Sequence, residues 1–172
     1  MDRHIEVVAE RELDAQDREL LGQWSRALFG SAEDMYDWAT PDWRVLVRVG
    51  GQLAAHAAIS QRTVSANEEA ARVGGIGGVM VSQEFQGKGH AKAAMLRAQE
   101  FIRDTLQLEF GFLFCSPRLV PYYQRLGWFP IEGPVSFAQG GSDVTWHEEA
   151  MVLPLTNRHW PGPPVDLNGP PW

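Results

Sequence analysis

The chain has 172 residues, 44% of them hydrophobic and 10% aromatic, which is enough for one globular domain with a buried core over residues 1–172. Its formal net charge of −7 argues against a nucleic-acid-binding surface, which is usually basic, and suits either a cationic small-molecule substrate or solubility alone. No apolar run is long enough to span a membrane, the N-terminus is charged and Cys115 is the single cysteine, so we expect a cytoplasmic protein without membrane contact, disulfides or a cysteine-rich metal site.

The first half of the chain predicts a strand, a helix and then a run of strands. Val7 and Val8 suit an opening strand. The helix that follows is bounded by Asp14, which is a good N-cap, and by a glycine at position 30. Two strand-like runs on either side of a Gly-Gly turn at residues 50–51 indicate a hairpin, and a third strand-like run leads to Val81.

The second half predicts the longest helix and two further strands. Apolar residues fall on one face of a helix over residues 90–107. The segment "EFGFLFCS" is typical of a short strand that is buried on both faces, and "PRLVPYYQRLGW" indicates a brief helix that ends at Gly127. "AMVLPL" is expected to be the closing strand, followed by a proline-rich tail. This order predicts an α+β fold with a mixed sheet.

The strand-to-helix junction "QGKGHA", residues 86–91, suits the binding of a phosphate group. The first N–H groups of a helix have no partner inside it, and the helix dipole adds positive charge there. Glycines next to those donors let a bulky anion come close, so we expect a pyrophosphate at this turn. The pattern is neither a Walker A loop nor a Rossmann fingerprint.

With the apolar strand and the tyrosine-bearing helix that follow it, this junction resembles the GNAT superfamily of acyl-CoA-dependent N-acyltransferases. The resemblance spans residues 5–154, and its most specific pieces are "QGKGHA" and "PYYQRLGW". It implies the GNAT fold, with splayed strands in a mixed central sheet flanked by helices, and acetyl-CoA as cofactor. The turn would hold the pyrophosphate, and the strand before it would pair with the pantetheine arm and donate an N–H group to the thioester. The cofactor-binding residues that the resemblance implies are Val79, Met80, Val81, Gln86, Gly87, Lys88, Gly89, His90, Ala91 and Ser116.

The resemblance also implies a catalytic residue, Tyr123. Its position in "YYQRLGW" matches the family tyrosine that protonates the sulfur of coenzyme A, whereas Tyr122 is expected to pack. The alternative for Tyr123 is a core aromatic residue with a satisfied hydroxyl group. Cys115 is expected to be a small buried hydrophobe, and the alternative is an acyl-cysteine in a ping-pong reaction.

A closer resemblance, to aminoglycoside 2'-N-acetyltransferases, rests on "AAHAAISQR", "VMV", "RLGW", "MVLPL" and a tryptophan at the C-terminus. It implies that a terminal carboxylate on Trp172 and acidic side chains bind the cationic amines of the sugar. Asp34, Asp37 and Glu148, or its neighbour Glu149, fall near the acidic positions of that family. The alternative for each acidic residue is an ordinary solvated charge. An aminoglycoside or amino sugar is therefore the preferred acceptor.

Gly77 departs from that family, because the matching position there carries a glutamate that acts as the base through water. The proton of the amine would then go to another group or along a water chain, or the substrate would differ. His56 is one candidate base, although a lone histidine in an apolar strand is more often structural. The glycines at residues 74–78 indicate either room for a bulky group against the backbone or a β-bulge.

The tail "WPGPPVDLNGPPW" also resembles the end of nodulation-factor N-acyltransferases, which act on an amino sugar as well. Its alternative role is an irregular strap over the sheet. Other functions stay open: acetylation of polyamines or other small amines, transfer of a longer acyl group, a non-catalytic acyl-CoA-binding protein, and a protein that sequesters antibiotics. The family also suggests a homodimer.

Overall fold

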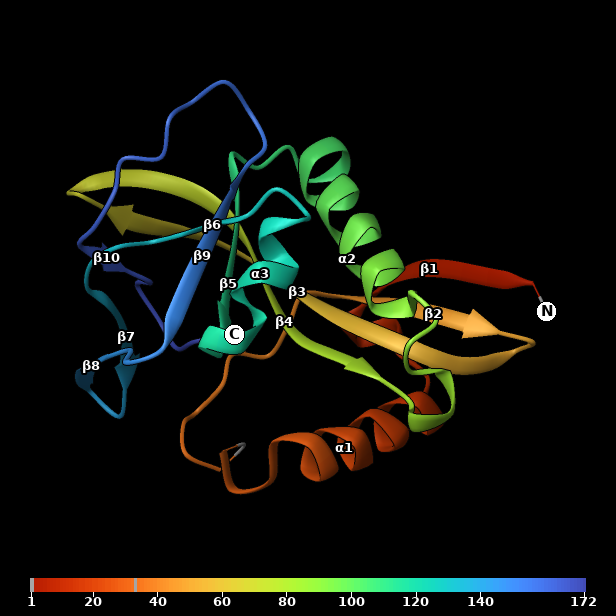
Figure 1. Ribbon diagram of the computed structural model, residues 1–172. Coiled ribbons are helices and arrows are strands. Elements are labelled where there is room, and N and C mark those ends of the chain that lie inside the picture. Colours follow the sequence, from red (N-terminus) through yellow and green to blue (C-terminus); the bar gives the residue numbers. More distant parts are fainter. Residues whose placement is uncertain (1, 33) are drawn as a thin grey trace.

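The computed structural model describes residues 2–32 and 34–172, and it confirms the α+β class with the splayed mixed sheet (Figure 1). Within these residues the sheet has ten strands. They are β1 (Arg3–Ala9), β2 (Trp43–Val49), β3 (Gln52–Ala66), β4 (Glu69–Val81), β5 (Phe110–Cys115), β6 (Phe129–Pro130), β7 (Val135–Gln139), β8 (Ser142–Thr145), β9 (Glu149–Pro154) and β10 (Val165–Asp166). The helices are α1 (Ala15–Phe29), α2 (His90–Glu100) and α3 (Val120–Gln124), with a π-helical turn at Phe101–Thr105 and 3₁₀ turns at Glu10–Glu12, Gly30–Ala32, Gln83–Phe85 and Pro117–Leu119.

The sheet runs in the order β6-β9-β5-β4-β3-β10-β7-β8, and β2 and β1 continue it from the first half of β3. Strand β3 is long enough to pair with β2 at its start and with β10 at its end. The pairs β4–β5 and β7–β10 are parallel, and the other pairs are antiparallel. Helix α2 therefore serves as the crossover between the parallel strands β4 and β5.

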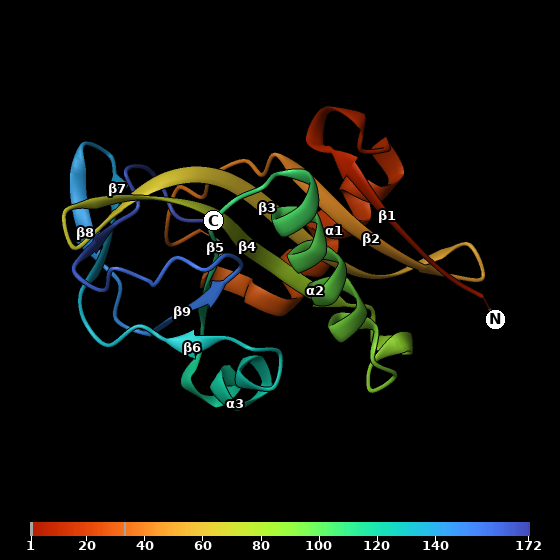
Figure 2. The ribbon, with the colours of Figure 1, turned by 90° about the horizontal axis from the view of Figure 1, so that it is seen from above.

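Helices α1 and α2 cover opposite faces of the sheet (Figure 2). The predicted limits of α1 are confirmed, because the Asp14 carboxylate accepts the N–H of Gln16 at 2.8 Å and Gly30 ends the helix with a φ of +53°. The predicted helix over 90–107 is α2 followed by the π-helical turn. None of the helices in the part of the chain described is long and apolar enough to cross a membrane.

Strands β4 and β5 part in the middle of the sheet. Their ladder ends at the pair Ile76–Leu113, after which β4 continues to Val81 and β5 stays paired only with β9. Helix α2 follows the end of β4, α3 follows the end of β5, and the C-terminus of the described chain lies beside β5 (Figures 1 and 2). The gap is therefore the place where the turn before α2, the helix α3 and the tail can act on one ligand.

The tail is more ordered than the sequence predicts, and "AMVLPL" is not the last strand. β10 follows it, and the hairpin β7–β8 precedes it around Gly140 and Gly141. These strands have two to five residues, too few for a clear hydrophobic period. The alternative role of the tail, a strap over the sheet, is correct in part: Trp172 packs edge-on against Phe112 and Trp160 packs edge-on against Phe110 in a second core, while β10 joins the sheet itself.

Substitution of Gly75 is expected to displace the tail. A Cβ placed on Gly75 would lie 2.1 Å from Cε2 of Trp172, so Gly75→Ala should lower the free energy of unfolding by about 1–3 kcal/mol, the usual effect of overpacking. Gly22→Ala is the matched control, because its Cβ would meet only the end of the Arg26 side chain at 3.4 Å, and it should gain up to about 1 kcal/mol in helix propensity. Chemical denaturation measures both; equal stability of Gly75→Ala and the parent would contradict the packing.

Candidate active site

The turn before α2 has the geometry of an anion-binding site. Gly87 and Gly89 have φ values of +73° and +78°, which L-residues rarely adopt. A Cβ placed on either glycine would meet no described atom within 4 Å, so the space above the turn is open. Gly89 is the N-cap of α2, and no side chain in the described chain caps the helix. The first N–H groups of α2 thus remain available to a ligand.

His90 and Lys88 add to this turn, and their contacts fit a pyrophosphate. Nδ1 of His90 is buried and has no hydrogen-bond partner within the described residues. Burial, and then the positive charges of Arg3 and Lys88, lower the pKa of His90 below its ordinary value of 6.5. The ammonium of Lys88 donates to the main-chain oxygen of Glu84 at 3.0 Å and lies over the ring of Phe85. An unpaired buried nitrogen beside two cations is suited to an anionic ligand.

The end of β4 leads from the gap to this turn. Val79 and Val81 are half-buried and pack against the core under α2, whereas Met80 is 4% exposed and packs toward α1. The side chain of Met80 is therefore unavailable to a ligand, and only its backbone can take part, as the sequence predicts for all three residues. Gln86 and Ala91 flank the glycines of the turn on the strand side and the helix side.

Tyr123, a residue of α3, is buried in the core cluster that also contains residues of α2. It is 6% exposed, its ring contacts those of Tyr122 and Trp128, and burial raises its pKa well above the ordinary value of 10, with Cys115 and Tyr122 adding to the shift. The phenol therefore keeps its proton at neutral pH. A protonated hydroxyl at this position is able to serve as a general acid.

Cys115 and Ser116 lie where β5 ends. Burial, followed by the charges of Glu149 and Glu148, raises the pKa of Cys115 to about 11. The thiol is thus protonated at neutral pH, which argues against an acyl-cysteine intermediate and for the expected buried hydrophobe. The main-chain oxygen of Ser116 accepts the N–H of Leu119 at 3.0 Å and begins the turn toward α3.

Gly77 and Trp172, both predicted to lie in the acceptor site, are neighbours. A Cβ on Gly77 would lie 2.8 Å from the main-chain carbonyl carbon of Trp172 and 3.1 Å from its oxygen. Gly77 comes directly after the last residue of β4 that pairs with β5. The missing side chain thus makes room for the main chain of Trp172 at the gap.

Arg62, which sequence reasoning missed, holds the tail in this position. Its guanidinium donates to the main-chain oxygens of Pro170 at 2.6 Å and Leu167 at 3.3 Å, and it lies 5.0 Å from the ring centre of Trp172. The indole N–H of Trp172 donates to the main-chain oxygen of Phe112 at 3.2 Å. The only sign of this role in the sequence was a lone arginine within a largely apolar strand, β3.

The predicted acidic residues lie in two places. Asp34 and Asp37 are exposed on the loop before β2, and this loop meets the tail, because the N–H of Ala39 donates to the oxygen of Pro171 at 2.7 Å. The loop is also fastened to β7, where Gln139 accepts the N–H of Asp37 at 2.8 Å. Both carboxylates therefore belong to the tail side of the gap.

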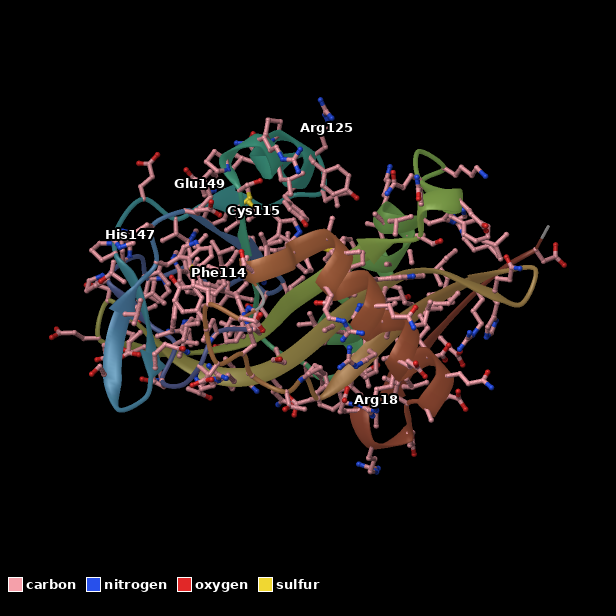
Figure 3. All side chains as sticks on the ribbon, turned by 90° about the horizontal axis from the view of Figure 1, so that it is seen from below. Arg18, Phe114, Cys115, Arg125, His147 and Glu149 are labelled. Atoms are coloured by element: carbon pink, nitrogen blue, oxygen red, sulfur yellow. The ribbon has the colours of Figure 1, made fainter. Side chains whose placement is uncertain are left out.

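Glu148 belongs to a separate acidic groove near α3. The groove has a volume of about 590 Å³ and is lined by Pro117, Val120, Pro130, Ile131, Glu132, Gly133, Glu148 and Glu149. Figure 3 shows Glu149 beside Cys115 at the end of β5, with Phe114 on the side of the aromatic cluster. No cluster of three metal-ligating side chains occurs in residues 2–32 and 34–172.

His56 does not have the geometry of a base. It is 1% exposed, its Nδ1 lies 2.7 Å from the oxygen of Gly78, and its Nε2 lies 3.2 Å from Nη1 of Arg44. Burial lowers its pKa to about 4. With both ring nitrogens engaged, His56 has no free site for a proton from the acceptor, so the structural alternative is favoured.

Comparison with known protein sequences shows similarity to acetyltransferases. The sequence profile of the acetyltransferase (GNAT) domain matches residues 18–131. The aminoglycoside 2'-N-acetyltransferase of Mycolicibacterium fortuitum is 33% identical over 108 residues, which cover 61% of this chain and 54% of that protein. The match thus spans about half the length of this curated relative.

Solved structures share the fold. Escherichia coli ElaA aligns with a TM-score of 0.64 and 19% identity, over 88% of this chain and 99% of that chain. A chimera of the spermidine N-acetyltransferase SpeG from Vibrio cholerae and hSSAT aligns with a TM-score of 0.59 and 17% identity, over 88% and 95% of the two chains. At these identities the likeness establishes the architecture.

The titration of His90 tests the cofactor turn. In the free protein its imidazole should titrate below pH 6.5, because burial and two cations disfavour the imidazolium. Coenzyme A should move the midpoint upward, since its phosphates favour the charged ring, whereas pantetheine, which lacks them, should not. Histidine carbon–proton NMR spectra measure the midpoint; a midpoint that stays unchanged at saturating coenzyme A would contradict the placement of the pyrophosphate.

Proposed function

The chain belongs to the GNAT acetyltransferase family, and we propose that it transfers the acetyl group of acetyl-CoA to a primary amine of an aminoglycoside or related amino sugar. The observation that supports this acceptor class is the sequence similarity to an aminoglycoside 2'-N-acetyltransferase. The cofactor assignment is supported by the open glycine turn and the uncapped N-terminus of α2.

Acetyl-CoA supplies the acetyl group as a thioester. The N–H groups at the start of α2, together with Lys88 and His90, would hold its pyrophosphate, as helix N-termini hold phosphates in general. The backbone of β4 from Val79 to Val81 would lie along the pantetheine arm, and an N–H group there would stabilise the oxyanion. This part of the chain would thus hold one of the two reactants in place, and such positioning contributes strongly to the rate enhancement of a bimolecular transfer.

Tyr123 would protonate the departing sulfur. Its raised pKa keeps the hydroxyl protonated throughout the pH range in which an amine can be neutral. A buried phenol also keeps its geometry, because its ring is packed against Tyr122 and Trp128. The proton is thus present when the sulfur departs, and the fixed geometry suits its transfer.

The acceptor would approach from the tail side of the gap. There the main chain of Trp172 lies against Gly77, and the loop that carries Asp34 and Asp37 is bonded to the tail. The carboxylates would attract a polycationic acceptor and orient its amines. Gly77 has no side chain to accept a proton, so water beside Trp172 would carry away the proton of the attacking amine.

A second candidate, a non-catalytic acyl-CoA-binding protein, is favoured by one observation, the absence of a side chain at Gly77. It predicts saturable binding of coenzyme A without turnover on any amine. Acetylation of polyamines, an enzymatic alternative, predicts turnover of spermidine instead of amino sugars.

A matched pair of aminoglycosides tests the acceptor. Kanamycin B carries an amine at the 2' position and kanamycin A carries a hydroxyl there, so the protein should release the thiol of coenzyme A with kanamycin B and much more slowly with kanamycin A. Thiol release is followed with a chromogenic disulfide, and spermidine and glucosamine complete the panel. Equal rates with the two kanamycins would contradict 2' selectivity, and binding of acetyl-CoA without release of thiol from any amine would favour the second candidate.

Removal of the Tyr123 hydroxyl tests the general acid. Tyr123→Phe should lower kcat by about 10²–10⁴-fold, while the affinity for coenzyme A stays unchanged. Tyr122→Phe is the control, because the buried hydroxyl of Tyr122 has no hydrogen-bond partner in the described chain and its loss should leave the rate unchanged. Full activity of Tyr123→Phe would remove it from the mechanism.

A further inference from the structure

Strand β4 contains a β-bulge just after its last pair with β5, in the stretch that borders the gap. Ala58 pairs with Gly77 and His56 pairs with Met80, so two residues of β4, Gly78 and Val79, face a single residue of β3. Gly78 has a φ of +56°, as a bulge residue in the left-handed region requires. The bulge thus sets the direction of the backbone that enters the stretch from Val79 to Val81.

His56 holds the carbonyl group of this bulge. Its Nδ1 lies 2.7 Å from the oxygen of Gly78, and its Nε2 lies 3.2 Å from the guanidinium of Arg44. A carbonyl oxygen only accepts and a guanidinium only donates, so the two partners together require the neutral ring with its proton on Nδ1. The ring is fully buried, and burial accordingly lowers its pKa to about 4.

Arg44 is fixed in turn by the acidic residue in front of α1. Its Nε donates to Glu10 at 2.5 Å, and Arg18 on α1 forms an ion pair with the same carboxylate. The side chains of Arg44 and Glu10 are each 17% exposed. The bulge is therefore connected through His56 to charged groups that are themselves held by two elements, β2 and α1.

The direction of the Gly78 carbonyl also decides the direction of the next N–H group. In a trans peptide the C=O and the following N–H point in opposite directions, so the N–H of Val79 points away from His56. His56 lies on the face of the sheet that carries Leu46 and Met80, under α1, and the opposite face lies toward α2. The hydrogen bond from His56 thus turns the N–H of Val79 toward the α2 face.

We infer that His56 is a positioning residue for acetyl transfer: by holding the carbonyl group of Gly78 it fixes the bulge that aims the backbone N–H groups of residues 79–81 at the thioester of acetyl-CoA. The inference rests on the proposed path of pantetheine along these residues. His56 touches neither reactant; it acts through the peptide group between Gly78 and Val79.

Two variants and a stability control separate positioning from packing. His56→Leu keeps the bulk and removes both hydrogen bonds, and it should lower kcat for kanamycin B by about 10- to 100-fold, the effect of a small misplacement of reacting groups. The Kd of coenzyme A should change much less than kcat, because the turn before α2, which would bind the phosphates, is intact. His56→Gln, which can donate to Gly78 and accept from Arg44, should recover part of the rate. Leu108→Ala, a substitution of a buried residue in the turn before β5 that makes no bond to the bulge, should lose stability and keep its kcat below its melting temperature.

Parent-like kcat in His56→Leu would overturn the inference, and so would an equal loss of kcat in Leu108→Ala. A second measurement needs no acceptor and therefore does not depend on the proposed substrate. Nitrogen NMR of the folded protein should show the proton of His56 on Nδ1. The amide shifts of residues 79–81 should differ between the complexes with coenzyme A and acetyl-CoA, and His56→Leu should abolish the difference. A proton on Nε2, equal shifts in the two complexes of the parent, or a difference that persists in His56→Leu would each overturn the inference.

Discussion

Distant parts of the chain pack directly against the four glycines of β4 at positions 74, 75, 77 and 78. Ile102 of the π-helical turn packs where Gly74 has no Cβ, and Trp172 covers Gly75 and Gly77. His56 forms a hydrogen bond with the carbonyl group of Gly78. Each contact comes from a different part of the chain. A methyl group on Gly74, Gly75 or Gly77 would lie less than 3 Å from the packed side chain or main chain beside it. Packing, not flexibility, therefore requires glycine at these three positions.

These contacts explain why the two halves of the proposed site meet. On the α2 side, the bulge at Gly78 leads the chain to the open turn, whose glycines leave the start of α2 accessible. On the tail side, Arg62 bonds to the segment before Trp172 and thereby keeps it against Gly77. The gap between β4 and β5 lies between them. In the proposed site, one strand would thus place both the cofactor and the acceptor through its backbone.

Features that depend only on residues adjacent in the sequence were predictable from it. The glycine turn, the N-cap Asp14 and the helix that follows residue 89 all arise from local patterns, and they were placed correctly. The glycines at 74–78 predicted a bulky neighbour or a bulge, and the structure contains both. The neighbour itself could not be identified, because Trp172 reaches β4 through the tertiary fold. The role of His56 was undecidable for the same reason: its partners Arg44 and Gly78 lie on two other strands. The strands β6, β7, β8 and β10 were missed because they are too short to show a period.

A crystal structure of the complex with acetyl-CoA would test the proposed cofactor site, because it would show where both ends of the cofactor lie. We expect the pyrophosphate on the N–H groups of residues 87–91 and the pantetheine arm along residues 79–81, with the thioester carbonyl facing the gap and the sulfur within hydrogen-bond reach of Tyr123. A cofactor bound elsewhere, or a thioester turned away from the gap between β4 and β5, would contradict this placement.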